Sequence, residues 1–358
     1  MPRIVLAGRV PHIVRSSVSF YTIGAAVTLR RLFGRKLVPG WPRDMEIVNL
    51  FWREQFNRAL RFPDIQEGRA YFDSLQTYTD ETFAVERTPS GSDCPPGDWL
   101  TARGLQSPVT LLYLHGGGYT FYAAITRRFG EMLSSMLGMK LFAPDYRLTP
   151  EHPHPAQIED ARAAYRYLLA QGTDPSQLVI IGDSAGGHLT LMTLLALREA
   201  RLPQPALAVG ICPWTDIGER GASLTSNNRY DLLQGYMAIQ FGKWLLGDGP
   251  YTPEELSPIY HDFRGLAPIY LQGGGKEILI DMIRDFANVL IEQGCDVVLD
   301  VWEHMTHDFQ ANGETIPESK EALERIKQAI AYRTGQEGEA PFTAGLRTEV
   351  AAVLRKTT

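Results

Sequence analysis

A serine between two glycines is the first residue of this sequence that could do chemistry. Ser184 lies in Gly-Asp-Ser-Ala-Gly (182–186), directly after the apolar run 176–182 and before an apolar helical pattern over 184–200. A serine on a sharp strand-to-helix turn presents its hydroxyl above a sheet, and glycines on both sides let the two backbones approach. The pattern predicts a nucleophile at Ser184; the alternative interpretation is an ordinary tight turn.

A glycine-rich stretch could supply the groups that such a nucleophile needs. His115 is followed by Gly116, Gly117 and Gly118, directly after another apolar run, 109–114. Backbone N–H groups in such a loop can point at a developing oxyanion, and one such donor is worth about 3–4 kcal/mol to acyl transfer. We expect His115 itself to orient the loop, because separate candidates exist for the base. The alternative is a flexible loop.

Two histidines could act as the base. His304 and His307 lie in Trp-Glu-His-Met-Thr-His-Asp-Phe, at and after the end of the apolar run 296–303. A base must reach the serine from a loop beyond a strand end, which is easier for His307 than for His304. Spacing alone favours His307 and leaves His304 open.

The elements that must position these residues follow an alternating pattern. Short continuous apolar runs indicate strands buried on both faces, and amphipathic or apolar segments between them indicate helices. Strands are predicted at 109–114, 140–146, 176–182, 205–212, 267–273 and 296–303, and helices at 44–62, 155–172, 184–200, 278–294 and 317–333. Alternation of this kind predicts an α/β fold with a mostly parallel sheet covered by helices on both faces.

Composition and charge exclude several other classes of protein. The chain has 358 residues and a net charge of -6, which gives no reason to expect nucleic acid as a partner. Its three cysteines, Cys94, Cys212 and Cys295, have no metal-binding spacing and do not form a disulfide framework, so we expect no metal and a reducing, cytoplasmic location.

The N-terminal segment has its own character. Residues 1–43 contain eight arginines and lysines and no acidic residue, a charge of +8, which leaves -14 for the other 315 residues. The apolar stretch 16–29 is shorter than the ~20 residues that span a membrane. We expect a helix that either covers the rest of the protein as a lid or contacts a membrane surface peripherally.

Four motifs in this order give the sequence a family resemblance: His115-Gly-Gly-Gly, Asp145-Tyr-Arg-Leu-Thr-Pro-Glu151, Gly182-Asp-Ser-Ala-Gly-Gly187 and Met305-Thr-His307-Asp-Phe309. The chain resembles the hormone-sensitive-lipase-like esterases of the α/β-hydrolase fold from about residue 108 to 333. The resemblance implies Ser184 as the nucleophile, His307 as the base, and the N–H groups of Gly117, Gly118 and Ala185 as the oxyanion hole. It also implies a structural His115, an Asp/Arg pairing within 145–151, no cofactor, and allows a homodimer. The family often has glycine at the positions of His304 and Asp308.

A catalytic serine and histidine need a carboxylate as the third member of the triad. In this fold the carboxylate must follow a strand end between residues 184 and 307. Asp216, Glu277 and Asp281 meet this condition. The resemblance places the family's acid at Glu277. Its loop, Gln-Gly-Gly-Gly-Lys-Glu (272–277), is not a phosphate loop, because Tyr270 holds the first glycine slot and Glu277 the Ser/Thr slot.

These observations together predict a carboxylic ester hydrolase acting on short- to medium-chain acyl esters or an acetylated hydrophobic small molecule. The alternatives are an acyltransferase or lactonase, or a non-catalytic receptor like the plant gibberellin receptor, which has lost the histidine. Expected domains are cap helices and lead-in at 1–85, core at 86–215 and 259–335, a cap insertion at 216–258 and a tail at 336–358. Five aromatic residues are expected as walls of the substrate pocket: Tyr119, Phe121, Tyr122, Trp214 and Tyr230.

Overall fold

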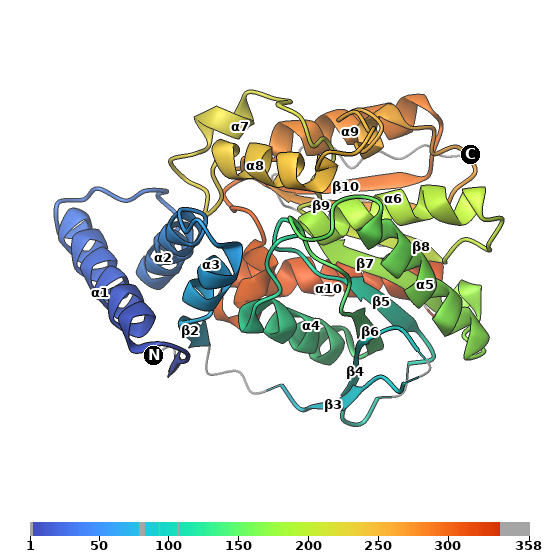
Figure 1. The fold of residues 1–358 in the computed structure, drawn as a ribbon, viewed down its shortest axis with the longest axis horizontal. Helices are drawn as coiled ribbons and strands as arrows, with labels where there is room; N and C mark the ends of the chain where they lie inside the picture. The colour runs from blue at the N-terminus through green and yellow to red at the C-terminus, as the bar shows by residue number, and fades with distance from the viewer. Residues whose placement is uncertain (1–2, 79–82, 93, 106, 337–358) are drawn as a thin grey trace.

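The computed structural model describes residues 3–78, 83–92, 94–105 and 107–336, and Figure 1 shows their arrangement. The predicted tail at 336–358 lies, beyond its first residue, outside the described residues. A central sheet has the strand order β10-β9-β8-β7-β5-β6-β4-β3. Its strands are β3 (Val85–Pro89), β4 (Gly97–Ala102), β5 (Thr110–Leu114), β6 (Lys140–Pro144), β7 (Leu178–Asp183), β8 (Leu207–Ile211), β9 (Ile269–Gly274) and β10 (Val297–Trp302).

The six strands from β5 to β10 are parallel to one another, and β4 and β3 extend the sheet antiparallel at the edge beside β6. The central strands are buried on both faces, as their continuous apolar runs predict. The predicted fold class, a mostly parallel α/β sheet, is therefore confirmed. Parallel strands end at the same edge, so the loops after β5, β7, β9 and β10 can meet there.

Helices cover both faces of the sheet. They are α4 (Ala124–Leu137), α5 (Ala156–Ala170), α6 (Ala185–Glu199), α9 (Ile280–Glu292) and α10 (Pro317–Arg333). Leu111 shares a core with Leu133 of α4 and Ile326 of α10. Leu112, the next residue along β5, lies in the core of the other face, together with side chains from α5, α6 and α9. This alternation is the two-residue period of a strand.

The remaining elements form a cap at the carboxyl end of the sheet. The N-terminal part comprises β1 (Arg3–Leu6), α1 (Val10–Leu32), α2 (Arg43–Ala59), α3 (Ile65–Phe72) and β2 (Leu75–Tyr78), with β1 and β2 paired antiparallel. The insertion at 216–258 contributes α7 (Ser223–Ser226) and α8 (Gly235–Leu246) and, as predicted, no strand; all of its residues are described. In Figure 1, α1 is the outermost helix and α2 lies between it and the rest of the molecule.

Hydrogen bonds join the two parts of the cap to each other and to the core. From α2, Asn49 Nδ2 donates to the carbonyl of Tyr230 at 2.6 Å, and Arg53 Nε donates to the carbonyl of Asp231 at 2.7 Å. From the α1–α2 connection, Trp41 Nε1 donates to the carbonyl of His304 at 2.6 Å. These bonds hold α2 over the loop that follows β10.

Candidate active site

Ser184 forms a sharp elbow between β7 and α6. Its backbone has φ 54° and ψ -118°, a conformation that L-residues rarely adopt and that the surroundings must enforce. Its N–H donates to the carbonyl of Ile211 at 2.8 Å. A Cβ on Gly186 would lie 1.8 Å from the Leu114 carbonyl oxygen, and one on Gly182 2.3 Å from the Gly186 carbonyl oxygen. The two glycines are therefore needed for the close packing that raises the serine above the sheet.

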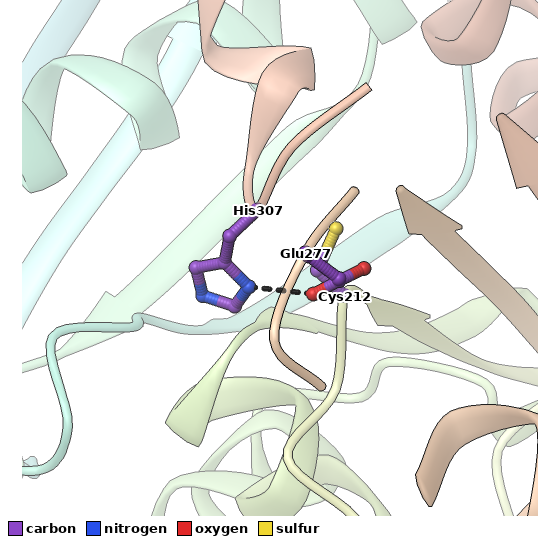
Figure 2. A group of neighbouring side chains, drawn as sticks. All are labelled: Cys212, Glu277 and His307. Carbon is purple, nitrogen blue, oxygen red and sulfur yellow. Dashed lines mark hydrogen bonds and ion pairs between the residues drawn. The ribbon is translucent and has the colours of Figure 1, made fainter. Parts of the chain in front are cut away.

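His307 and Glu277 form a buried pair at the same sheet edge, shown in Figure 2. His307 Nδ1 lies 2.7 Å from Glu277 Oε2, and both side chains are almost fully buried. The other oxygen of Glu277 accepts from the backbone N–H of Gly274 at 2.6 Å. An ionised carboxylate can only accept, so Nδ1 carries the proton and Nε2 is the nitrogen left to act as a base. Within the described part of the chain, Nε2 has no hydrogen-bond partner.

The glycines before Glu277 bring the acid loop against the base loop. A Cβ on Gly274 would lie 2.5 Å from the Met305 carbonyl oxygen, and one on Gly275 would lie 2.5 Å from that of Glu303. The N–H groups of Gly275 and Lys276 donate to the carbonyls of Trp302 and Met305, each at 2.8 Å. Side chains at the two glycines would therefore push Glu277 away from His307.

The other candidates for acid and base lie elsewhere. Asp281 accepts from the backbone N–H of Ser223 at 2.8 Å and thereby joins α9 to α7. Asp216 pairs with Arg220 at 2.8 Å. His304 is exposed and contacts the α1–α2 connection through its carbonyl. Of the residues that spacing left open, the structure brings only Glu277 and His307 together.

The loop after β5 presents backbone N–H groups near this pair. Gly117 has φ 105° and Gly118 has φ 62°, both in the region that favours glycine. A Cβ on Gly117 would lie 2.1 Å from the Phe121 carbonyl oxygen, and one on Gly118 2.5 Å from the Phe241 ring. No described residue supplies a hydrogen-bond acceptor for the N–H groups of Gly117, Gly118 and Ala185. These three groups are thus available to an oxygen of a bound molecule.

His115 holds this loop, as expected. Its ring is stacked between Tyr122 and Tyr146, with ring centroids 3.9 and 4.1 Å away. Nδ1 lies 2.7 Å from the Gly116 carbonyl. Burial lowers the pKa of His115 to about 3, so the ring is neutral. The expected Asp/Arg pairing within 145–151 is wrong, since Arg147 instead pairs with Asp160 of α5 at 2.8 Å and with Glu159.

Asp231 belongs to the site although no sequence pattern indicates it. Its side chain is fully buried in the cap insertion. One oxygen accepts from the backbone N–H of His307 at 3.1 Å and the other from that of Ile278 at 2.7 Å. The carboxylate of Asp231 therefore holds both Ile278, the residue after Glu277, and His307. Burial raises the pKa of Asp231 to about 6, and the charge of His307 opposes this shift.

Several carboxylates act on the charge of His307. Asp308 Oδ2 lies 3.3 Å from Nε2, on the side of the ring opposite to Glu277. Burial lowers the pKa of His307, but the charges of Asp308, Glu277 and Asp231 and the bond to Glu277 outweigh it and raise the pKa to about 10. Asp308 has φ 50°, the left-handed conformation that glycine adopts most easily. This backbone explains why glycine suits the position.

A cavity of about 430 Å³ opens beside the pair. His307, Asp308, Gly116 and Gly117 line one part of it. Apolar side chains form most of the remainder; they include Met45, Val48, Trp52, Phe56, Phe72, Phe121, Ile125, Phe129, Leu232, Phe309 and Ile316. The cavity therefore joins polar groups of the core to an apolar chamber whose other wall is α2.

Only one of the five aromatic residues predicted as pocket walls, Phe121, is among the described residues that line this cavity. Tyr119 is buried with its hydroxyl 2.5 Å from His188 Nδ1, and Trp214 packs against the same histidine. Tyr122 stacks on His115, and Tyr230 packs with the α1–α2 connection and lies beneath Lys276. These four rings do not line this cavity and pack against partners in the core or cap, so their role as walls of the substrate pocket stays a prediction.

Cys212, Glu277 and His307 have donor atoms within 4.8 Å of one another, a spacing compatible with a metal ion (Figure 2). Glu277 and His307 direct these atoms at each other in their hydrogen bond. Burial, and then the charges of Glu277 and Asp308, raise the pKa of the Cys212 thiol. A protonated thiol is a poor ligand, so the trio is better described as a thiol beside an acid–base pair. All three cysteines are free.

Comparisons with known proteins agree with this fold. The family profile described as alpha/beta hydrolase fold matches residues 111–311. An acetyl-hydrolase of Streptomyces hygroscopicus is 35% identical over 299 residues, which cover 81% of this chain and 96% of that relative. An ethyl acetate hydrolase of Pseudomonas putida is 31% identical over 235 residues, covering 62% and 72% of the two chains. The crystal structure of an esterase from the bacterial hormone-sensitive lipase family superposes with a TM-score of 0.71 at 33% identity, covering 79% of this chain and 97% of the other. The chain therefore belongs to the α/β-hydrolase fold family and, within it, to the hormone-sensitive-lipase-like esterases, which are serine ester hydrolases.

Proposed function

We propose that Ser184, His307 and Glu277 form the catalytic triad of this ester hydrolase. The observation that carries the proposal is the 2.7 Å hydrogen bond between His307 Nδ1 and Glu277 Oε2. It fixes the tautomer in which Nε2 can take a proton. Ser184 stands on the neighbouring elbow after β7, and Asp183, the residue before it, lines the same cavity as His307.

In the acylation step, Ser184 Oγ bonds to the ester carbonyl carbon while its proton moves to His307 Nε2. The electrons of the carbonyl double bond move onto the oxygen, where the N–H groups of Gly117, Gly118 and Ala185 stabilise the negative charge. When this intermediate collapses, the bond to the alcohol oxygen breaks. His307 gives its proton to that oxygen, the alcohol leaves, and Ser184 carries the acyl group.

Water completes the reaction by the same route. His307 takes a proton from a water molecule as the water oxygen bonds to the acyl carbon, and the oxyanion forms in the same place. Collapse breaks the bond to Ser184 Oγ, which receives the proton from His307 as the carboxylic acid leaves. Glu277 remains ionised throughout and stabilises the imidazolium in both steps.

The cavity suggests the class of ester. Its volume of about 430 Å³ is within the ~300–1,000 Å³ typical of small-molecule sites, and its walls are mostly apolar. We infer a substrate that is either a short- to medium-chain acyl ester or an acetylated hydrophobic small molecule. The similarity to an acetyl-hydrolase and to an ethyl acetate hydrolase supports an acetyl group as the part transferred to Ser184.

Hydrolysis of 4-nitrophenyl acetate, butyrate and octanoate tests the proposal. We expect the highest kcat/KM with acetate or butyrate and loss of nearly all activity in Ser184→Ala. A fluorophosphonate should label the wild-type protein and leave Ser184→Ala unlabelled. Ser184→Ala with wild-type activity would overturn the assignment of the nucleophile, and a clear preference for octanoate would overturn acetyl as the group transferred to Ser184.

A further inference from the structure

The outer face of α1 is unusual for a surface helix, because it carries a stripe of exposed apolar side chains. Nine of the eleven large hydrophobic side chains that are exposed among the described residues lie between Ile4 and Phe33. Along α1 they follow one stripe at spacings of three and four residues; its members, with the exposed Ala25, are Val10, Val14, Val18, Tyr21, Leu29 and Leu32. Leu32 and Phe33 at the end of the stripe are 77% and 74% exposed.

The inward side of α1 combines apolar side chains, Phe20, Ile23 and Val27, with polar ones that hydrogen bonds hold in place. Ser16 is fully buried, with its hydroxyl 2.6 Å from that of Ser74 and 3.3 Å from Gln55 Oε1. His12 Nε2 lies 2.9 Å from Glu67. These partners determine which side of the helix faces α2 and α3. The apolar stripe therefore remains outside and has no covering element in the described chain.

Cations surround this stripe. Residues 1–43 contain no acidic residue. Glu46 pairs with both Arg30 and Arg31, and Glu67 pairs with Arg9. Arg15, Arg35 and Lys36 are exposed, and no described carboxylate lies within ion-pair distance of them. The surface thus combines uncovered apolar side chains with uncompensated positive charge.

We propose that this face of α1, together with Phe33, Arg35 and Lys36, docks onto an anionic lipid bilayer. A helix that lies in the membrane interface buries an apolar stripe among acyl chains and directs its cations to anionic headgroups. None of the helices in the described ranges is long and apolar enough to cross a membrane. The hydrogen bonds of His12 and Ser16 keep α1 attached to the protein, so it would lie flat on the surface.

Charge argues for lipid over a second copy of the chain. Two copies joined through this face would bring two basic segments together, and opposed like charges disfavour association. Anionic headgroups remove this repulsion. Docking through α1 would also bring the cavity close to the bilayer. The helix α2, which packs behind α1, supplies Met45, Val48 and Trp52 to the cavity wall. A lipophilic ester dissolved in the bilayer would be close to the cap that covers the cavity.

Cosedimentation of the full chain with vesicles tests the proposal without relying on catalysis. Two vesicle types are needed, phosphatidylcholine alone and phosphatidylcholine mixed with phosphatidylglycerol. The first variant, Leu29→Ser/Leu32→Ser/Phe33→Ser, removes part of the apolar stripe. The second, Arg15→Gln/Arg35→Gln/Lys36→Gln, removes the three cations. Its matched control, Arg103→Gln/Arg166→Gln/Lys243→Gln, changes the net charge equally at exposed cations elsewhere.

We expect binding to the anionic vesicles only. The cation variant should bind about a hundredfold more weakly at low ionic strength, the apolar variant at least about tenfold more weakly, and the control nearly as well as the wild type. Thermal unfolding midpoints close to that of the wild type would show that the variants fold.

Three results would overturn the proposal. They are no binding to anionic vesicles, equal binding to neutral vesicles, and equal losses in the cation variant and its control. A dimer in light scattering that the apolar substitutions disperse would assign the face to a second copy instead.

Discussion

Asp231 Oδ1 accepts a hydrogen bond from the backbone N–H of His307 at 3.1 Å, across 76 residues of sequence. Its second oxygen accepts from Ile278, the residue after Glu277. Asp231 lies in the cap insertion, and its own carbonyl accepts from Arg53 of α2. The spacing of acid and base therefore depends on a buried carboxylate that comes from the cap and not from the hydrolase core.

Asp231→Asn should lower kcat with little change in KM. The amide can accept through one oxygen only, so either Ile278 or His307 loses its acceptor, at a cost of about 1.5–3 kcal/mol or roughly tenfold to a hundredfold in rate. KM should change little, because Leu232 lines the cavity and Asp231 does not. The rising limb of the pH–rate profile should also move to lower pH, because the charge of Asp231 raises the pKa of His307.

Asp281→Asn is the matched control for Asp231→Asn. Asp281 also joins the insertion to the segment after β9, through Ser223, but it makes no bond to the base loop. A loss of stability alone would affect both variants alike and leave the pH profile unmoved. Equal kcat values for the two variants would show that Asp231 has no positioning role.

Glu277→Gln should reduce kcat far more than Asp231→Asn does. The amide group would favour the wrong tautomer of His307 and remove the charge that stabilises its imidazolium form; for the triad aspartate of a serine protease the corresponding change costs about 10⁴-fold. Glu277→Asp should recover part of the activity, because it restores the charge with a side chain one methylene shorter. Steady-state hydrolysis of 4-nitrophenyl acetate measures both. A Glu277→Gln enzyme within tenfold of the wild type would contradict the proposed triad.

The strands and the acid–base loops could be predicted because local patterns encode them. The apolar runs before Ser184 and His307 are long enough to indicate strands buried on both faces, and helix 317–333 begins and ends where its amphipathic pattern does. Chain order, together with the need for a position after a strand end, then limits the acid to three carboxylates. Of the three, Glu277 is expected to lie nearest to the loop after β10, because its own loop directly follows β9, the neighbouring strand.

Other parts of the structure have no local signal. Asp231 resembles any acidic residue of a polar insertion, and only its burial and its distant partners distinguish it. Helix α4 begins after Ala123, with no side-chain cap and no acidic residue in its first turn, so the usual start signals are missing. Tyr119 directly follows the His-Gly-Gly-Gly motif and Trp214 follows the predicted strand 205–212, but the sequence does not specify that both rings pack against the buried His188.

Arg325→Met should lower the free energy of unfolding by about 3–5 kcal/mol, the usual cost of leaving one partner of a buried ion pair uncompensated. Arg325 of α10 and Asp300 of β10 are 2% and 1% exposed and lie 2.9 Å apart. Urea unfolding measures the loss. Glu321→Gln is the control, because Glu321 contacts the same arginine from the surface, and it should cost about 1 kcal/mol or less. Equal stability of Arg325→Met and the wild type would show that the buried ion pair between Arg325 and Asp300 does not stabilise the fold.

Asp308→Asn should move the pH dependence of catalysis. His307 acts as a base only in its neutral form, so a raised pKa places the active form at higher pH. Asp308 faces Nε2 at 3.3 Å, Glu277 binds Nδ1, and Asp231 binds the backbone. Burial works against these three charges, and their combined effect raises the pKa of His307 to about 10. We therefore expect kcat/KM of the wild type to increase with pH well above neutrality.

Removing the charge of Asp308 should shift the rising limb to lower pH by about one pH unit or more, as expected for an opposite charge this close. The variant would then exceed the wild type in activity at neutral pH, while the two enzymes would converge at high pH. Glu303→Gln is the control, because Glu303 pairs with Arg284 and does not act on His307. Initial rates across the pH range in buffers of constant ionic strength make the comparison. If Asp308→Asn and the wild type share one rising limb, the carboxylate beside Nε2 does not govern the charge of the base.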